Sequence, residues 1–254
     1  MVLLSWPPAI SSDHTVIDLL PLEDHSVIIS AVDIDSNSVV VVTGGGSGIG
    51  LAIAKAFAAQ GARVAIADIE RSALDEAVAQ LPSGTLAVRT DVADLASVEG
   101  LRDAVLAEFG HVDVLCNNAG VSTFNLIADQ TIDDWKWVLS VNLWGVIHGV
   151  HTFLPVLRAQ GTPSHIVNTA SVAGLASGLP FLGPYSVSKV GVVSVSETLR
   201  HELTGSPIGV SLGKPSTSRL LMPRMPQKMA LRAIAGARPT LSRKPHPQYA
   251  TVPF

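Results

Sequence analysis

The stretch Val39-Val40-Val41-Val42-Thr43-Gly44-Gly45-Gly46-Ser47-Gly48-Ile49-Gly50 joins a run of β-branched residues to a glycine-rich turn. Four consecutive valines favour extended backbone without polar alternation, which is typical of a strand covered on both faces of a parallel sheet. Glycines lack the Cβ atoms that would keep a backbone from closing on a pyrophosphate, and residues 51–59 predict a helix whose first amides attract phosphate. This order of elements predicts a dinucleotide site, against the alternative of an ordinary strand-to-helix turn.

The composition indicates a single globular domain. Of the 254 residues, 47% are hydrophobic and 15% are charged, which suffices for one sizeable core with appendages. No apolar run reaches the roughly eighteen residues of a membrane span, and no lysine or arginine precedes an N-terminal apolar stretch. The single cysteine, Cys116, excludes an internal disulfide and suits a reducing compartment. We therefore expect a cytoplasmic protein with no membrane partner and no redox role for Cys116.

The charges are divided unevenly along the chain. Up to Glu202 there are 9 basic and 21 acidic residues, whereas from Leu203 onward there are 8 basic residues and no acidic one. Such a split can mark a tail that binds nucleic acid or acidic lipid. Because the basic residues are scattered among prolines, we favour a solvated, poorly ordered end and expect no nucleic-acid partner.

Strands alternate with helices from residue 39 onward. After the first strand and helix, apolar patterns predict strands over 63–68, 85–90, 112–116, 165–170 and 208–212 and helices over 71–80, 95–109, 132–154 and 184–203. This alternation predicts a doubly wound, parallel α/β Rossmann fold of three layers, in a single domain over 39–213. Residues 1–38 are expected to be an appendage that adds an edge strand or remains mobile, and 214–254 a basic, proline-rich tail.

Asp68 ends the second strand some twenty residues after the glycine turn. A carboxylate there can accept hydrogen bonds from the adenosine ribose hydroxyls and would repel a 2′-phosphate. The position therefore favours NAD over NADP, although Arg71 lies close enough in sequence to leave NADP open. The alternative is an exposed aspartate at a strand end.

Three residues make a reaction centre plausible. Tyr185 and Lys189 are four apart, so a helix places them on one face, and a nearby ammonium favours the phenolate. An unperturbed phenol, with a pKa of about 10, is a poor base at neutral pH. Ser171 follows the strand over 165–170 at its carboxyl end, the edge where ligands bind in open α/β sheets. Taken alone, Tyr-x-x-x-Lys is common by chance.

Together these motifs resemble the short-chain dehydrogenase/reductase family over about 39–203. The chain matches the family's Thr-Gly-x-x-x-Gly-x-Gly at 43–50, its Asn-Asn-Ala-Gly at 117–120, and its Ser with Tyr-x-x-x-Lys at Ser171, Tyr185 and Lys189. The resemblance implies that Tyr185 is the general acid/base, that Lys189 lowers its pKa and holds the nicotinamide ribose, and that Ser171 orients the substrate oxygen. It also implies that Asn142 anchors a water that relays protons; without the resemblance, Asn142 would be a helix residue satisfied by local backbone.

The resemblance further implies which residues contact the cofactor. The glycine turn would hold the pyrophosphate, Asp91 and Val92 the adenine, and the stretch 118–120 would form a wall of the site. The complete set is Thr43, Gly44, Ser47, Gly48, Ile49, Gly50, Asp68, Asp91, Val92, Asn118, Ala119, Gly120, Tyr185, Lys189 and Pro215.

The chain departs from the family after its final predicted strand. Where the family has Pro-Gly and a nearby threonine, this sequence has Pro215, Ser216 and Leu220, with Thr217 as a possible substitute. Residues 221–254 contain six prolines and no convincing strand, so we expect the family's last strand to be missing. Its loss would weaken the homo-oligomer that the family usually forms and leave a bare edge, which the N-terminal appendage could pair or which could promote aggregation.

The sequence thus predicts an NAD-dependent oxidoreductase that interconverts a secondary alcohol and a ketone. Because the stretch 172–183 between Ser171 and Tyr185 is apolar, we expect an apolar small-molecule substrate. The alternative is a catalytically weakened dinucleotide-binding protein. His148 and His151 are three apart but lack accompanying ligands, so no metal site is predicted.

Overall fold

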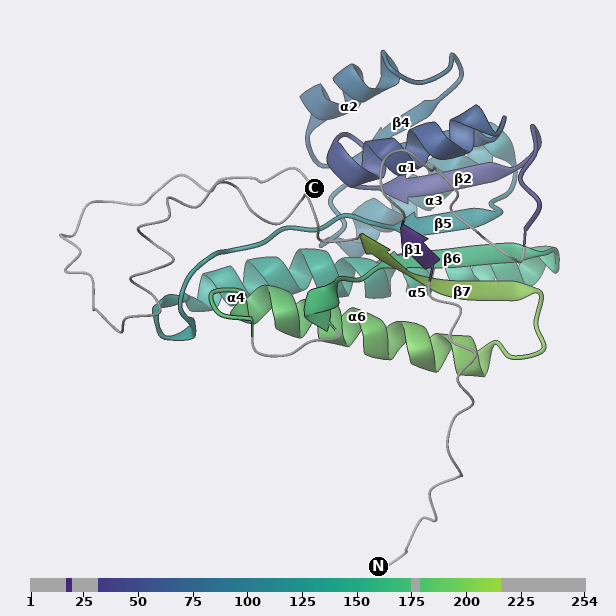
Figure 1. The fold of residues 1–254 in the computed structure, drawn as a ribbon. Helices are drawn as coiled ribbons and strands as arrows, with labels where there is room; N and C mark the ends of the chain where they lie inside the picture. The colour runs from purple at the N-terminus through teal and green to yellow at the C-terminus, as the bar shows by residue number, and fades with distance from the viewer. Residues whose placement is uncertain (1–16, 20–31, 175–178, 216–254) are drawn as a thin grey trace, which may run out of the picture.

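The fold is a parallel sheet with helices on both faces (Figure 1). The computed structural model describes residues 17–19, 32–174 and 179–215. Seven strands lie in the order β1-β7-β6-β5-β2-β3-β4, and each neighbouring pair is parallel. The strands are β1 (Ile17–Leu19), β2 (Val39–Thr43), β3 (Arg63–Asp68), β4 (Leu86–Arg89), β5 (Val114–Asn117), β6 (Ser164–Thr169) and β7 (Ile208–Pro215). The predicted doubly wound α/β fold is confirmed.

Helices follow the strands in alternation. They are α1 (Gly48–Ala59), α2 (Arg71–Val78), α3 (Leu95–Phe109), α4 (Ile132–Leu139), α5 (Gly145–Gln160) and α6 (Gly183–Glu202). A π-helical turn, η2 (Ser140–Trp144), lies between α4 and α5, and short 3-10 turns occur at η1 (Ile127–Asp129) and η3 (Val172–Gly174). Helix α1 begins at Gly48, so the last residues of the glycine turn already belong to its first turn.

The valines of β2 supply both halves of the core. Val40 and Val42 pack with α1 and α2 on one face of the sheet, whereas Val39 and Val41 pack with α3, α5 and α6 on the other. All four side chains are 0% exposed, because alternate residues of a strand point to opposite faces and helices cover both. The unbroken valine run thus suits a strand in the interior of the sheet, and the carboxyl end of β2 lies at the edge that carries the glycine turn.

The prediction of one helix over 132–154 is wrong in two respects. The π-helical turn η2 interrupts it, with Gly145 N–H donating to the carbonyl of Ser140, and α5 then continues to Gln160. Pro155 does not end the helix. Proline removes one backbone hydrogen bond, but its ring is exposed here, and continuing the helix buries Leu157 fully in the core. The helix ends instead at Gly161, whose φ is +66°.

The edge of the sheet beside β7 is paired. Strand β7 extends to Pro215, three residues beyond the predicted end at residue 212. Over that extension β1 lies parallel to it, in the register Ile17↔Gly213 and Leu19↔Pro215. Of the two alternatives for the N-terminal appendage, the structure therefore has the edge strand. The predicted tail over 214–254 begins too early, because Lys214 and Pro215 belong to β7. Residues 216–254, Ser216 and Leu220 included, lie outside the described residues.

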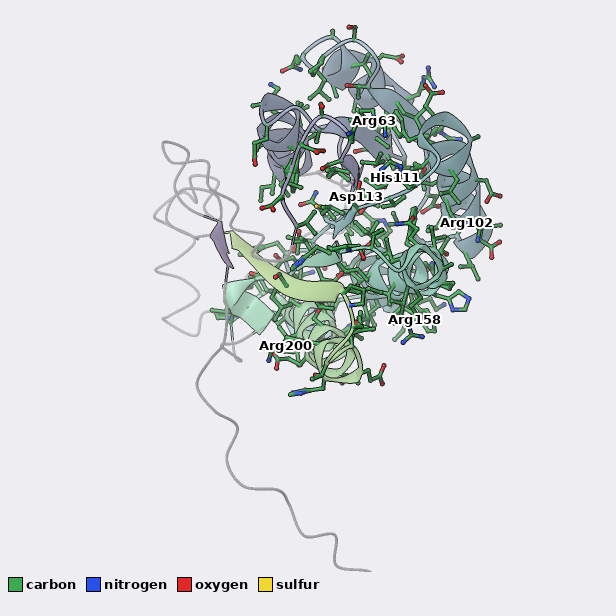
Figure 2. The ribbon with its side chains drawn as sticks, turned by 90° about the vertical axis from the view of Figure 1, so that its right-hand side faces the viewer. Arg63, Arg102, His111, Asp113, Arg158 and Arg200 are labelled. Carbon is green, nitrogen blue, oxygen red and sulfur yellow. The ribbon has the colours of Figure 1, made fainter. Side chains whose placement is uncertain are left out.

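An aspartate joins the amino ends of the two central strands, opposite the edge that carries the glycine turn. Asp113 Oδ2 accepts from Val39 N at 2.7 Å, and His111 Nε2 lies 3.1 Å from the same oxygen (Figure 2). His111 also reaches the carbonyl of Asn37 at 3.2 Å. These contacts fix where β2 starts relative to β5, and hence how their carboxyl ends align.

Candidate active site

The glycine turn closes tightly over the end of β2. Gly44 has a φ of +64°, and a Cβ on it would lie 2.8 Å from Ala119 Cα; a Cβ on Gly50 would overlap the carbonyl of Gly44. Glycine at these positions therefore lets the turn pack directly against the loop after β5 and lets α1 start against the backbone of the turn. Ser47 precedes α1 without a side-chain capping bond, and no acidic residue lies in the first turn. The helix dipole is therefore unopposed there, and the turn fits a pyrophosphate.

Asp68 points at the glycine turn. Its Oδ2 accepts from Gly46 N at 3.0 Å and its Oδ1 from Glu70 N at 3.1 Å. Each carboxylate oxygen has two lone pairs, so these bonds leave capacity for further donors such as ribose hydroxyls. Arg71 is directed to Asp75, with Arg71 Nε 3.1 Å from Asp75 Oδ1.

Thr43 ties the glycine turn to the loop after β5. Its Oγ1 accepts from Asn118 N at 3.0 Å and from Ala119 N at 3.2 Å. Asn118 Nδ2 in turn donates to the carbonyl of Thr43 at 3.1 Å, and Thr169 Oγ1 donates to Asn118 Oδ1 at 3.3 Å. The predicted cofactor wall at 118–120 is thereby held against the ends of both β2 and β6.

The structure brings Ser171, Tyr185 and Lys189 together at the carboxyl edge. They are 3%, 5% and 3% exposed. Tyr185 and Ser171 share a side-chain hydrogen bond. Lys189 Nζ donates to the carbonyl of Thr169 at 2.7 Å and lies 5.7 Å from the centroid of the Tyr185 ring. The carboxyl end of β6, Ser171 two residues beyond it, and the first turns of α6 thus converge.

The electrostatics of this cluster differ from the prediction. Burial raises the pKa of Tyr185, and the hydrogen bond to Ser171 opposes that rise only in part. The expected lowering by Lys189 is not found, because burial disfavours the charged form of each group. Burial likewise lowers the pKa of Lys189 to about 8. Further positive charge is needed before the phenolate of Tyr185 forms readily.

Asn142 lies in η2 and is 0% exposed. Its Oδ1 accepts from Val121 N at 2.7 Å, and its Nδ2 donates to the carbonyl of Val121 at 2.9 Å and to Ser188 Oγ at 3.0 Å. The alternative that local backbone satisfies Asn142 is therefore wrong, since Val121 is 21 residues away. A Cβ on Gly120 would lie 3.5 Å from Asn142 Oδ1 and 3.7 Å from Lys189 Nζ, so both groups border Gly120.

Two residues of this region were not predicted. Ser188 Oγ donates to the carbonyl of Tyr185 at 2.7 Å while accepting from Asn142. His148 Nδ1 lies 2.9 Å from the carbonyl of Val92, in the predicted adenine loop. The place of Ser188 inside Tyr-x-x-x-Lys was a usable signal, whereas nothing in the sequence pairs His148 with a residue 56 positions earlier.

The remaining predicted positions are less informative. Ile49 and Gly48 form the first turn of α1, and for Pro215 the structure describes backbone pairing with Leu19. Burial raises the pKa of the Cys116 thiol to about 12, in keeping with a packing role. Within the described ranges no three His, Cys, Asp or Glu side chains gather as metal ligands. None of the described helices combines the length and apolarity needed to cross a membrane.

A parallel sheet with a glycine turn on its central strand and a Ser, Tyr and Lys cluster at its carboxyl edge defines a Rossmann-fold oxidoreductase. Residues 38–220 match the short chain dehydrogenase family. The chain belongs to this family, whose members are oxidoreductases acting on CH–OH groups.

Among curated relatives, the chain is 39% identical over 184 residues to a C alpha-dehydrogenase from Sphingobium, a match that covers 71% of this chain and 60% of the relative. It is 36% identical over 184 residues to meso-2,3-butanediol dehydrogenase from Serratia marcescens, covering 71% of each. Among solved structures, a short chain dehydrogenase/reductase from Burkholderia phymatum in complex with NAD is 38% identical with a TM-score of 0.70, covering 81% of this chain and 79% of that one.

Proposed function

We propose that the protein is an NAD(H)-dependent oxidoreductase that interconverts a secondary alcohol and a ketone. The observation that carries the proposal is the convergence of Ser171, Tyr185 and Lys189, each at most 5% exposed, beside the loop 118–120 and the glycine turn. An ordinary helix face would leave a Tyr-x-x-x-Lys pair in solvent. Burying the polar Tyr185 and Lys189 side chains away from water costs free energy, and an apolar pair could fill the same space without that cost.

The residues divide the chemistry between them. In the oxidation direction, Tyr185 Oη takes the proton of the substrate hydroxyl, and the Ser171 hydroxyl hydrogen-bonds the substrate oxygen while its charge changes. NAD, when bound, would supply the hydride acceptor and the positive charge of its nicotinamide ring. Lys189 adds an ammonium within 6 Å of the Tyr185 ring, at 5.7 Å from its centroid. Asn142 and Ser188 hold the backbone of Tyr185 in place.

The preference for NAD over NADP rests on Asp68. A 2′-phosphate at the end of β3 would face this carboxylate, which the amides of Gly46 and Glu70 hold in position. Arg71, the nearest candidate to offset the repulsion, is paired with Asp75. The solved relative from Burkholderia phymatum is in complex with NAD, which supports the same choice here.

The surroundings of Tyr185 support an apolar substrate. Val121 and Leu182 pack against the cluster formed by Val138, Ala173 and Tyr185. Nearby, Phe124 N-terminal to η1 stacks on Phe181, with ring centroids 5.0 Å apart, and Phe124 is 58% exposed. An exposed ring stacked on a half-buried one, beside a buried polar cluster, suits a substrate whose carbon skeleton is apolar and whose reacting oxygen is polar.

We also propose a homo-oligomer in the cytoplasm. Trp144, Val187 and Val190 are 53%, 49% and 48% exposed and come from η2 and α6, which contact one another. Large apolar side chains gathered on adjoining elements favour burial against a second copy.

The test is a titration with NADH and NADPH, followed through tryptophan fluorescence, and then an assay of alcohol-dependent NADH formation. We expect saturable binding that prefers NADH. Tyr185→Phe should lower turnover at least a hundredfold while the affinity for NADH stays within about twofold, since the ring remains and only the proton-transferring hydroxyl is lost.

Two results would decide against the proposal. A folded chain that binds neither cofactor is not a dehydrogenase. A chain that binds NADH but shows no turnover that depends on Tyr185, across a panel of apolar secondary alcohols and ketones, supports the second candidate, a weakened dinucleotide-binding protein. The raised pKa of Tyr185 and the sequence departures at Ser216 and Leu220 favour that candidate.

A further inference from the structure

The loop that follows β4 is shaped mainly by its own residues. Ala93 N donates to Asp91 Oδ1 at 2.9 Å, and Asp94 N donates to the carbonyl of Asp91 at 3.1 Å. Asp91 N donates to Ser97 Oγ at 3.0 Å, at the start of α3. These bonds set the local turn, but each lies within seven residues of chain. They do not fix where the turn sits relative to the catalytic half of the molecule.

Two described hydrogen bonds from distant elements reach this loop. Thr90 N donates to the carbonyl of Asp68, at the end of β3, at 2.8 Å, and the bond to Val92 comes from His148 on α5. His148 Nδ1 lies 2.9 Å from the carbonyl oxygen of Val92. A carbonyl only accepts, so Nδ1 must carry the hydrogen, and the neutral imidazole is the Nδ1–H tautomer. Val92 itself is 7% exposed, so water could only partly replace the imidazole as the hydrogen-bond donor to its carbonyl.

Two neighbours on α5 and η2 restrict the imidazole and the loop. The rings of Trp144 and His148 have centroids 5.8 Å apart at an interplanar angle of 43°. A Cβ on Gly145 would lie 2.8 Å from Val92 Cγ2, so the helix backbone itself touches the loop. One face of this helical segment therefore holds Val92 through a hydrogen bond and through direct packing.

We propose that His148 is a positioning residue for cofactor binding: its Nδ1–H holds the Val92 carbonyl and thereby aims the Asp91–Val92 turn at the adenine. The inference rests on the proposed NAD(H) function. Asn142 is six residues earlier on the same helical segment, about 9 Å along the axis. The segment from η2 into α5 thus supports the adenine end through His148 and the catalytic end through Asn142.

The experiment compares cofactors with and without the adenosine half. Dissociation constants for NADH and for reduced nicotinamide mononucleotide are measured with the full chain and with His148→Leu, which keeps bulk but removes the donor. We expect His148→Leu to weaken NADH about tenfold and the mononucleotide less than twofold, with turnover at saturating NADH unchanged within twofold. A tenfold loss is the size expected for one partly buried hydrogen bond.

Matched variants separate positioning from general damage. His148→Asn places an amide donor near the position of Nδ1 and should restore most of the NADH affinity, whereas His148→Gln places it near Nε2 and should not. His151→Leu, an exposed histidine on the same helix, should match the unmodified chain. Should His148→Leu fail to fold, the contrast between the Asn and Gln variants still decides.

Four outcomes would overturn the inference. Equal weakening of NADH and the mononucleotide would mean that His148 only stabilises the fold. Unchanged NADH affinity in His148→Leu, or equal NADH affinities in the Asn and Gln variants, would show that the Nδ1 hydrogen bond does not position the cofactor. Failure of the unmodified chain to bind NADH would overturn the proposed function and this inference with it, and that result is recognised before any variant is made.

Discussion

Ser188 links the backbone of Tyr185 to the side chain of Asn142. Its Oγ accepts from Asn142 Nδ2 at 3.0 Å and donates to the carbonyl of Tyr185 at 2.7 Å, in a site that is 0% exposed. The hydroxyl therefore couples the π-helical turn η2 to the first turn of α6. It acts on the phenol only through these two neighbours, so it positions Tyr185 and does not take part in proton transfer.

Ser188→Ala should therefore impair turnover without impairing cofactor binding. The change leaves an Asn142 N–H buried without its partner, which costs about 1–2 kcal/mol of stability. We expect kcat to fall about tenfold and the NADH dissociation constant to stay within twofold. Ser194→Ala, at an exposed position of α6, is the control and should leave both unchanged. A parallel loss of NADH affinity would contradict a role confined to Tyr185.

His165 is another buried polar residue, the second residue of β6. It is 4% exposed, its Nε2 lies 2.7 Å from Ser211 Oγ, and burial lowers its pKa to about 4. Because the folded pKa lies below the unfolded value of about 6.5, the unfolded chain binds more protons between these values. The stability that comes from neutral His165 is complete above pH 6.5 and is lost as the pH falls toward 4.

Unfolding in urea at pH 7 and pH 5 tests this dependence. From the two pKa values, lowering the pH from 7 to 5 should reduce the free energy of unfolding by about 2 kcal/mol more in the unmodified protein than in His165→Leu. The variant lacks the titrating imidazole. The variant is expected to be less stable at pH 7, since Ser211 loses its partner. Equal losses in the two proteins would show that His165 does not carry the pH dependence.

At the scale of elements, α5 approaches β5 without space for a side chain between them. A Cβ on Gly149 would overlap Asn117 Oδ1, while Asn117 Nδ2 donates to Asn168 Oδ1 at 2.9 Å. The amide is thus held by β6 and cannot move away freely. The glycine lets the helix that carries His148 lie close to the strand that leads into the loop 118–120.

Gly149→Ala should destabilise the fold by about 2 kcal/mol, the usual cost of an overpacked core position. Gly100→Ala is the matched control, because Gly100 lies in α3 with nothing within 4 Å of its added Cβ. That substitution should stabilise the protein by up to about 1 kcal/mol through helix propensity. Thermal unfolding of both variants measures the difference, and similar effects at the two sites would refute the close approach.

The elements that the sequence predicted are those whose signal is local. The valine run of β2 and the glycine turn specify a buried strand and the start of α1 without reference to the rest of the chain. The π-helical turn η2 was not predicted, because the residues on both sides of it are helical and its Asn142 side chain bonds to Val121, which lies 21 residues away. The sequence could not decide whether residues before 39 form an edge strand, because the partner of β1 is β7, which lies almost two hundred residues later in the chain.

The site was predicted to a similar extent. Motif spacing indicated Tyr185, Lys189 and Ser171, and the structure brings them together. Spacing gives no information about desolvation, however, which reverses the expected direction of the Tyr185 pKa. It also could not indicate His148, whose partner is a backbone carbonyl and therefore has no residue type to recognise.

At the scale of the whole molecule, the exposed apolar side chains of η2 and α6 can be tested for association. Val190→Lys places a charge on this face, where Val190 is 48% exposed in the single chain. If the face is buried between copies, the charge should shift the protein to monomers in sedimentation-velocity runs. Val78→Lys on α2, where Val78 is 36% exposed, is the control and should leave the sedimentation coefficient unchanged. Identical behaviour of the two variants would exclude this face as the interface.

The pairing of β1 with β7 has a consequence for the order of assembly. Ile17 lies opposite Gly213, so the first described strand emerges from the ribosome about two hundred residues before the strand that receives it. Its edge cannot close until synthesis of the sheet is almost complete, whereas β2 and β3 can pair early. Contacts over such long separations are slow to form, so completion of this edge should be a late event in folding.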